Sequence, residues 1–214
     1  MIGLIDSGAG GVCTMRELHS LLPRESLLLL GDYGNAPYGK KSSRELLPII
    51  EDGIRRMYMA GAEKVLLACC TASAHFADLS AEAQKIALPI ISPTVEAALK
   101  CGEERKIAVI ATELTVSTHA FGSLLGESCV AEIAAGELVL AAEGEKSPSE
   151  LYNSMERVTD LASVRGADIL ILGCTHFHTF AKEIAEIAER KGIKKIISSA
   201  REGALELVRK IKKM

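Results

Sequence analysis

Residues 61–69 read Gly-Ala-Glu-Lys-Val-Leu-Leu-Ala-Cys, and residues 166–174 read Gly-Ala-Asp-Ile-Leu-Ile-Leu-Gly-Cys. Each stretch passes from Gly-Ala and an acidic residue through an apolar run of strand length to a cysteine. The two cysteines, Cys69 and Cys174, are 105 positions apart (174 minus 69). Self-similarity at a fixed offset indicates a repeated structural unit. The sequence therefore predicts two equivalent thiols on two similar units.

A second pair of stretches, residues 2–7 and 107–112, keeps the same offset (107 minus 2). Each is an apolar run that ends at a hydroxyl residue. The chain therefore divides into two similar halves. If the halves face each other about a pseudo-twofold axis, Cys69 and Cys174 approach a shared cleft from opposite sides. Inversion of a carbon centre by two bases requires this arrangement.

Apolar runs of strand length alternate with amphipathic helical patterns along the chain. The apolar runs are residues 2–5, 27–30, 65–68, 90–91, 107–110, 169–172 and 196–197. The amphipathic stretches are residues 43–60, 151–164, 180–191 and 201–212. Such alternation is typical of an α/β fold with parallel sheets and crossover helices.

Loop signals divide this pattern. We expect the boundary between the halves near Pro93, where residues 91–93 end a strand before residues 94–100 turn helical. Residues 141–149, rich in Glu and Gly, are expected to form a long loop.

Charge and hydropathy exclude two classes of partner. The formal net charge of the 214-residue chain is −3, and its charges are mixed, so the basic stripe of a nucleic-acid-binding protein is missing. The only dense basic stretch, residues 209–213, is expected to be a solvated last helical turn. No apolar run is long enough to cross a membrane.

We expect a cytoplasmic protein, because the chain enters an apolar strand at Ile2 without a secretory signal pattern. Six cysteines in such a chain are expected to be reduced, and no C-x-x-C unit suggests a zinc or thioredoxin-like site.

Polar and reactive residues gather at the ends of the predicted strands. They are Asp6, Ser7, Gly31, Asp32, Cys69, Thr71, Thr112, Cys174, Thr175 and His176. Open parallel sheets bind ligands beyond the carboxyl ends of their strands. The clustering therefore predicts a site at this edge.

Two loops could supply backbone donors to that site. Residues 6–11, Asp-Ser-Gly-Ala-Gly-Gly, follow a strand and precede a helix, so their N–H groups could hold an anion. They lack the dinucleotide and P-loop fingerprints, and a plain strand-to-helix turn is the alternative. Residues 31–39 form a second loop, rich in Gly and Pro.

Each thiol has a candidate activator. Asp6 ends a strand expected to neighbour that of Cys69, and His176 is two residues from Cys174. A thiol with an ordinary pKa of ~8.5 needs such help to act as a base near neutrality.

Other readings of these residues are simpler. Cys174, His176 and His178 could share a face and bind a metal if the strand continued, but we expect the run to turn helical. His19, His75 and His119 are expected to be structural, and Tyr58 and Phe76 to pack in cores.

Taken together, five motifs resemble the glutamate racemases of the cofactor-independent aspartate/glutamate racemase superfamily. The motifs are residues 6–11, Gly31-Asp32 with Pro37-Tyr38-Gly39, residues 68–72, Thr112 with Thr115, and residues 173–176. The resemblance implies two flavodoxin-like α/β halves with the active site between them. It also implies that the last helix returns to the first domain, so the domains are expected to be residues 1–93 plus 196–214, and 94–195. It implies no pyridoxal phosphate and no metal.

By this resemblance the protein interconverts L- and D-glutamate, and so supplies D-glutamate for peptidoglycan. Cys69 and Cys174 are then the catalytic bases, with Asp6 assisting Cys69 and His176 assisting Cys174. Asp32 and Glu143 match acidic positions tied to the activity. The expected contacts to the small amino acid substrate come from Ser7, Pro37, Tyr38, Gly39, Cys70, Thr71, Thr112, Thr115 and Thr175. The resemblance also makes a homodimer plausible.

The sequence departs from the family pattern at two places. Cys70 stands where the family has Asn, and a thiol replaces an amide donor poorly. Residues 177–178 read Phe-His in place of Tyr-Pro. These changes leave open a sister racemase or isomerase that acts on aspartate or another small amino or dicarboxylic acid. A catalytically silent dicarboxylate-binding module is a further alternative. A thiol redox protein ranks last, because adjacent cysteines form only strained disulfides.

Overall fold

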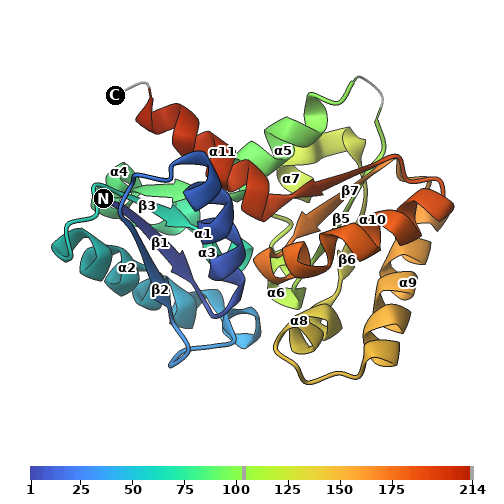
Figure 1. Cartoon of the computed structure of the whole chain (residues 1–214), viewed down its shortest axis with the longest axis horizontal. Helices are drawn as coiled ribbons and strands as arrows, with labels where there is room; N and C mark the ends of the chain where they lie inside the picture. The colour runs from blue at the N-terminus through green and yellow to red at the C-terminus, as the bar shows by residue number, and fades with distance from the viewer. Residues whose placement is uncertain (103–104, 213–214) are drawn as a thin grey trace.

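Two four-stranded parallel sheets, one in each half of the chain, form the framework of the molecule (Figure 1). The computed structural model describes residues 1–102 and 105–212. The strand orders are β2-β1-β3-β4 and β6-β5-β7-β8, so the halves share one topology. The predicted α/β fold with two similar parallel-sheet halves is therefore confirmed.

The strands have the following bounds. The first sheet contains β1 (Ile2–Asp6), β2 (Leu27–Gly31), β3 (Lys64–Leu67) and β4 (Ala87–Pro89), and the second contains β5 (Ile107–Ala111), β6 (Cys129–Ala134), β7 (Ile169–Gly173) and β8 (Lys195–Ser198). β6 was not predicted from the sequence, because this edge strand is only half-buried and carries Glu132 within its apolar run.

The helices pack on both faces of the two sheets. They are α1 (Gly10–Leu21), α2 (Ser43–Met59), α3 (Cys70–Ser73), α4 (Ala81–Ile86), α5 (Ile91–Leu99), α6 (Glu113–Ser117), α7 (Gly122–Leu125), α8 (Gly136–Ala142), α9 (Pro148–Val164), α10 (Ala181–Arg190) and α11 (Ser199–Ile211). Short 3₁₀ helices span Tyr38–Lys40, Phe76–Asp78, Gly126–Ser128 and Thr175–Phe180. No helix of the described ranges is both long and apolar enough to cross a bilayer.

The repeat extends to how the longest helices start. Ser42 and Glu45 form a capping box at the start of α2, and Ser147 and Glu150 form one at the start of α9. Both residue pairs are 105 positions apart (147 minus 42, 150 minus 45). A capping box satisfies orphan N–H groups of the first helical turn, so each half starts its long helix in the same way.

Local predictions around the boundary need correction. Residues 91–93 do not end a strand but form the first turn of α5, where Pro93 is tolerated because the first N–H groups of a helix have no intrahelical partner. The loop predicted at residues 141–149 is shorter, because α8 continues to Ala142 and α9 begins at Pro148. Tyr58, expected in a core, is 59% exposed on α2.

The last strand and the last helix belong to different halves. β8 pairs with β7 in the second sheet, so residues 196–198 do not join the first sheet as the expected domain boundary implied. α11 then crosses back, and its Gly203 packs against Ile90 so closely that a Cβ atom would overlap that side chain. Positions 103, 104, 213 and 214, which the domain and basic-tail predictions include, lie outside the described residues.

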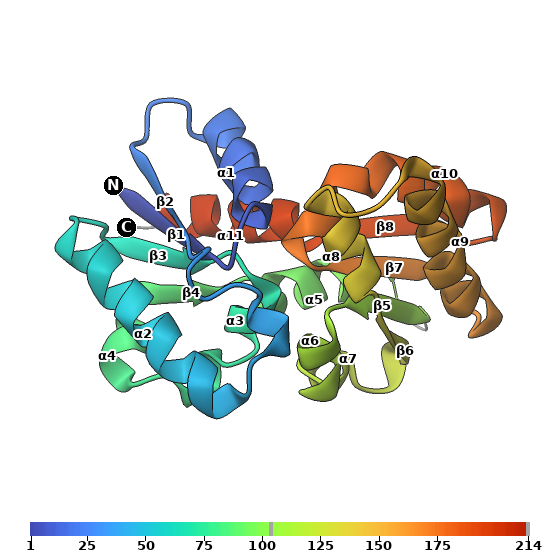
Figure 2. The same cartoon turned by 90° about the horizontal axis from the view of Figure 1, so that it is seen from below.

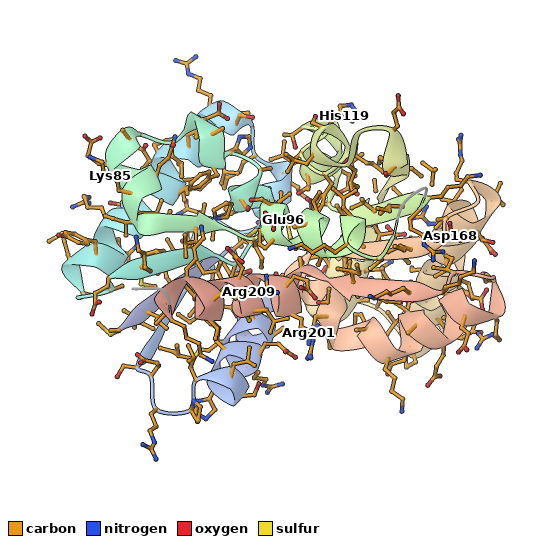
Figure 3. All side chains as sticks on the ribbon, turned by 90° about the horizontal axis from the view of Figure 1, so that it is seen from above. Lys85, Glu96, His119, Asp168, Arg201 and Arg209 are labelled. Carbon is orange, nitrogen blue, oxygen red and sulfur yellow. The ribbon has the colours of Figure 1, made fainter. Side chains whose placement is uncertain are left out.

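The contact between the halves is an apolar core. Leu4 and Leu18 of the first half belong to one buried cluster with Val109 and Ile171 of the second, and Leu207 of α11 joins them. α11 runs beside α5 across the junction; Figure 3 marks Arg201 and Arg209 on α11 and Glu96 on α5. The continuous core fixes the position of one sheet relative to the other, and with it the geometry of the cleft.

Candidate active site

A cavity of about 380 Å³ lies between the halves, at the carboxyl ends of β1, β3, β5 and β7. Seen from below, α3 of the first half faces α6 and α8 of the second (Figure 2). The first half lines the cavity with Ser7, Pro37, Tyr38, Gly39, Lys40, Cys69 and Thr71. The second half contributes Thr112, Glu113, Gly136, Glu137, Val139, Leu140, Lys146, Cys174 and His176.

The two repeated thiols line this cavity from opposite halves. Cys69 lies between β3 and α3, and Cys174 directly follows β7. Each cysteine is only 7% exposed. The repeat found in the sequence therefore brings two buried thiols to one cavity.

The Cys69 thiol is held in its protonated form. It donates to Ser7 Oγ at 3.8 Å. Burial raises its pKa to about 11, the charge of Asp6 adds to the rise, and hydrogen bonds with the Ala72 backbone and the Ser7 and Thr71 side chains offset part of it.

The Cys174 thiol belongs to a chain of three groups. His176 Nδ1 lies 3.7 Å from Cys174 Sγ, and His176 Nε2 lies 2.7 Å from Glu143 Oε1. If Nε2–H donates to Glu143, Nδ1 is the free acceptor that faces the thiol. Burial raises the Cys174 pKa well above its ordinary value, and the neighbouring thiols Cys70 and Cys69 add to the rise. The imidazole therefore provides a place for a proton that burial otherwise keeps on sulfur.

Asp6 is fully buried and joins the two halves. Its carboxylate accepts the Gly8 N–H at 3.0 Å and the Thr175 hydroxyl at 2.9 Å. Burial raises the Asp6 pKa, while the charge of His176 and these hydrogen bonds lower it. From the family resemblance, Asp6 is expected to assist Cys69. Its hydrogen bonds instead go to Gly8 and Thr175, and it influences the thiol through its charge.

The glycine loop therefore holds an anion of its own, the Asp6 carboxylate. Its glycines also allow close packing. A Cβ atom on Gly10 would overlap Thr175 Oγ1 and lie 2.7 Å from His176 Nδ1, and one on Gly11 would lie 2.6 Å from Asp6 Cβ. Gly10 thus lets α1 approach the residues that follow Cys174, and Gly11 lets it approach Asp6.

We predict that Asp6→Asn lowers the pKa of Cys69. A nearby negative charge disfavours a thiolate, so its removal moves the midpoint of thiol ionisation below the native value of about 11. The measurement is the pH dependence of Cys69 alkylation by iodoacetamide, followed by peptide mass spectrometry. An unchanged or higher midpoint in a variant that folds would contradict this role of Asp6.

Three hydroxyl groups form a triangle across the cleft. Thr71 Oγ1 lies 3.0 Å from Thr112 Oγ1 and 3.1 Å from Thr115 Oγ1, and the last two are 2.9 Å apart. Thr112 also caps α6 by accepting the Thr115 N–H. Hydroxyl groups donate or accept as needed, so the triangle can turn donors toward a bound carboxylate.

Tyr38 closes another wall. Its hydroxyl donates to Asp32 Oδ2 at 2.8 Å, and Asp32 also accepts from Asn35. Burial raises the Tyr38 pKa, and the Asp32 hydrogen bond raises it further, so the phenol remains protonated. The adjacent Gly39 packs against Thr112 of the other half, where a Cβ atom would lie 3.2 Å from Thr112 Cβ.

The predicted site residues thus occupy three kinds of position. Ser7, Pro37, Tyr38, Gly39, Cys69, Thr71, Thr112, Cys174 and His176 line the cavity. Asp6, Asp32, Thr115, Glu143 and Thr175 do not line it: Asp32, Thr115 and Glu143 hydrogen-bond to lining residues, and Asp6 and Thr175 hydrogen-bond to each other. Cys70 does neither, because its side chain packs in the apolar core shared by the halves.

The alternative metal reading of residues 174–178 lacks its third ligand. His178 Nδ1 lies 2.7 Å from Ser198 Oγ, and its Nε2 lies 3.4 Å from Glu17. The chain forms a 3₁₀ helix here, so the continued strand on which that reading depends does not form.

The cavity wall also has a charged part, which was not predicted from the sequence. Lys40, Glu113, Glu137 and Lys146 all line the cavity, with Val139 and Leu140 between the last two. The position of Lys40 directly after Pro37-Tyr38-Gly39 could have predicted that it lines the cavity. Lys146 lies in a loop whose distance from the cleft only the fold determines.

Comparisons with known proteins agree with this geometry. Residues 30–206 match the family model described as Asp/Glu/Hydantoin racemase. A glutamate racemase from Desulforudis audaxviator is 34% identical over 191 residues, which cover 86% of this chain and 70% of that protein. The crystal structure of a glutamate racemase isoform from Bacillus anthracis is 25% identical, with a TM-score of 0.88 over 100% of this chain and 82% of that chain.

The fold is also shared more widely. An aspartate racemase from Picrophilus torridus is 18% identical, with a TM-score of 0.72 over 99% of this chain and 94% of that chain, a likeness of fold alone. Because the family model covers most of the sequence, this chain belongs to the Asp/Glu/hydantoin racemase family of isomerases.

Proposed function

We propose that the protein interconverts L- and D-glutamate without a cofactor, by proton transfer between Cys69, Cys174 and the substrate α-carbon. The observation that carries the proposal is that these two thiols, one from each half, line the same cavity. A substrate with its α-carbon between them presents one face to each sulfur.

The proposed reaction balances without a co-reactant. One thiolate removes the α-proton, so an S–H bond forms, the Cα–H bond breaks, and the electron pair remains on the substrate. The opposite thiol then donates its proton to the other face, so its S–H bond breaks and a new Cα–H bond forms. The two thiols exchange protonation states, and the reverse reaction uses them in opposite roles.

Activation of the thiols must accompany substrate binding. Burial holds the pKa of both thiols above the ordinary value. A substrate ammonium group brings a positive charge into the cleft, and a positive charge favours the thiolate. His176, oriented by Glu143, offers Cys174 a second route for its proton.

Hydrogen-bond donors that are already in place would stabilise the carbanion-like state. The Thr71, Thr112 and Thr115 hydroxyls surround the cleft, and the Tyr38 phenol is fixed by Asp32. Donors held in position in a site with little water stabilise developing negative charge strongly. We propose that the threonine hydroxyls bind the substrate α-carboxylate, into which the charge spreads.

The names of the relatives support glutamate as the substrate, since the Desulforudis audaxviator protein is named a glutamate racemase. A D-glutamate product would suit peptidoglycan synthesis. The family description also includes aspartate and hydantoin, and aspartate is therefore the second candidate substrate. A cytoplasmic homodimer stays a prediction.

Proton NMR in D₂O tests the proposal. We expect the purified, reduced protein to remove the α-proton signal of both enantiomers of glutamate, and to do so for aspartate much more slowly. Exchange with aspartate and not with glutamate would identify aspartate as the substrate. Binding of glutamate without exchange, by folded protein with free thiols, would favour the dicarboxylate-binding module instead.

A further inference from the structure

Two lysines line the cavity from opposite halves, and the reaction proposed above uses neither. Lys40 ends the 3₁₀ helix Tyr38–Lys40 of the first half, and Lys146 lies in the loop between α8 and α9 of the second. Lys40 is exposed, and the Lys146 side chain is 30% exposed. The thiols and Thr71 are buried, so the ammonium groups belong to the solvent side of the cavity.

The acidic residues of the same wall, Glu137 and Glu113, contact other groups. Glu137 accepts two hydrogen bonds from the Arg157 guanidinium. Glu113 lies against the backbone of Gly136, where a Cβ atom would be 2.6 Å from its Oε2. The negative charge of Glu137 is therefore already balanced, and that of Glu113 is held at the start of α8.

The two lysines differ in how free they are. Lys146 Nζ lies 3.3 Å from Glu150 Oε1. In the described part of the chain, the lysine ion pairs involve Lys100, Lys146, Lys191 and Lys194, and Lys40 is not among them. Lys40 thus brings an unpaired positive charge to the cavity wall, and Lys146 brings one shared with Glu150.

A dicarboxylic amino acid needs more than the buried end of this cavity provides. Its α-carbon must lie between the thiols, where the surrounding groups are neutral hydroxyls that already hydrogen-bond to one another. A second carboxylate is bound most strongly by a cationic donor. Among the residues that line the cavity, Lys40 and Lys146 are the ones with an ammonium group.

We propose that Lys40, with Lys146 opposite, binds the distal carboxylate of the substrate and thereby selects dicarboxylic over neutral amino acids. This assignment rests on the proposed racemase function of the same cavity. Lys40 contributes more than Lys146, because the substrate carboxylate must compete with Glu150 for Lys146.

The test compares Lys40→Gln, Lys146→Gln and the double variant with Lys41→Gln, a matched control on the neighbouring residue that does not line the cavity. Glutamate and glutamine are the substrates, since glutamine has nearly the same shape without the distal charge. We expect KM for glutamate to rise about fivefold in Lys40→Gln and about twofold in Lys146→Gln, because exposed ion pairs are worth this much. We expect kcat to change little, and Lys41→Gln to match the wild type.

Glutamine and salt give the specific signatures. The double variant is expected to lose its preference for glutamate over glutamine, and its KM for glutamate should no longer rise with ionic strength. An unchanged KM for glutamate in the double variant would overturn the proposal. Equal losses for glutamate and glutamine would overturn it too, because they would indicate a structural role.

Calorimetry with glutarate separates this proposal from the proposed function. Glutarate has two carboxylates but neither an amino group nor a stereocentre, so its binding can be measured without racemisation. If the wild type exchanges no α-proton but binds glutarate more tightly than the double variant does, racemisation fails and the lysine assignment stands. If both proteins bind glutarate equally or not at all, the lysine assignment fails whatever the exchange assay shows.

Discussion

Cys69→Ser and Cys174→Ser are each expected to lower the rate of glutamate racemisation by about a thousandfold. Proton transfer by a positioned side chain contributes roughly 10²–10⁴ in rate, and a serine hydroxyl ionises far less readily than a thiol. Each thiol faces the cavity from its own half, so neither can replace the other. The measurement is circular dichroism of glutamate over time with purified, reduced protein.

The single variants should also separate the two faces of the substrate. The remaining thiol can remove and return a proton on its own side, so each variant is expected to exchange the α-proton of one enantiomer without racemising it. The two variants should prefer opposite enantiomers. Cys129→Ser is the control, because Cys129 lies on the edge strand β6 and does not line the cavity. Wild-type racemisation by either active-site variant would refute the two-thiol mechanism.

Gly10→Ala is expected to lower kcat/KM for glutamate by about a hundredfold, the size of a lost or misplaced general acid–base group. A methyl group at this position would overlap Thr175 Oγ1 and approach His176 Nδ1 to 2.7 Å. One of these side chains must then move, which disturbs either the Asp6–Thr175 hydrogen bond or the contact of His176 with Cys174.

The control for this variant is Gly34→Ala. The closest atom to a Cβ at Gly34 is Asp32 Oδ1 at 3.9 Å, an ordinary contact, so its activity should stay near that of the wild type. Thermal unfolding of both variants distinguishes a local effect on the site from general destabilisation. Full activity in a folded Gly10→Ala protein would mean that the alignment of Thr175 and His176 does not limit catalysis.

Much of the fold follows from local patterns in the sequence. The 105-residue repeat, the amphipathic α2 and α9 and every predicted strand except residues 90–91 appear as predicted, because hydrophobic periodicity reflects which residues a single element buries. Residues 90–91 instead follow β4, which ends at Pro89, and lead into α5. β6 and the first turn of α5 were missed, since a half-buried edge strand and a proline in a first helical turn carry weak local signals.

The line of reactive residues at strand ends was also visible in the sequence. Parallel strands bring their carboxyl ends to one edge, so the placement of Cys69 and Cys174 after equivalent strands predicted that both would reach one cleft. Both thiols do line one cavity. The reason is that strand direction and strand order restrict where the end of a strand can lie.

Only the tertiary structure decided which side chains meet. Asp6 reaches Thr175 across 169 positions of sequence, and Glu143 reaches His176 from a loop after α8. Cys70 turns into the core one residue after Cys69 faces the cavity, and Lys40 and Lys146 reach the cavity wall from opposite halves. These contacts depend on how the two halves pack and on the direction in which each side chain points at the start of its helix. Neither can be inferred from a local sequence pattern. The sequence by itself thus determined the two halves and the two thiols, while the packing of one half on the other determined the hydrogen bonds and charges that surround them.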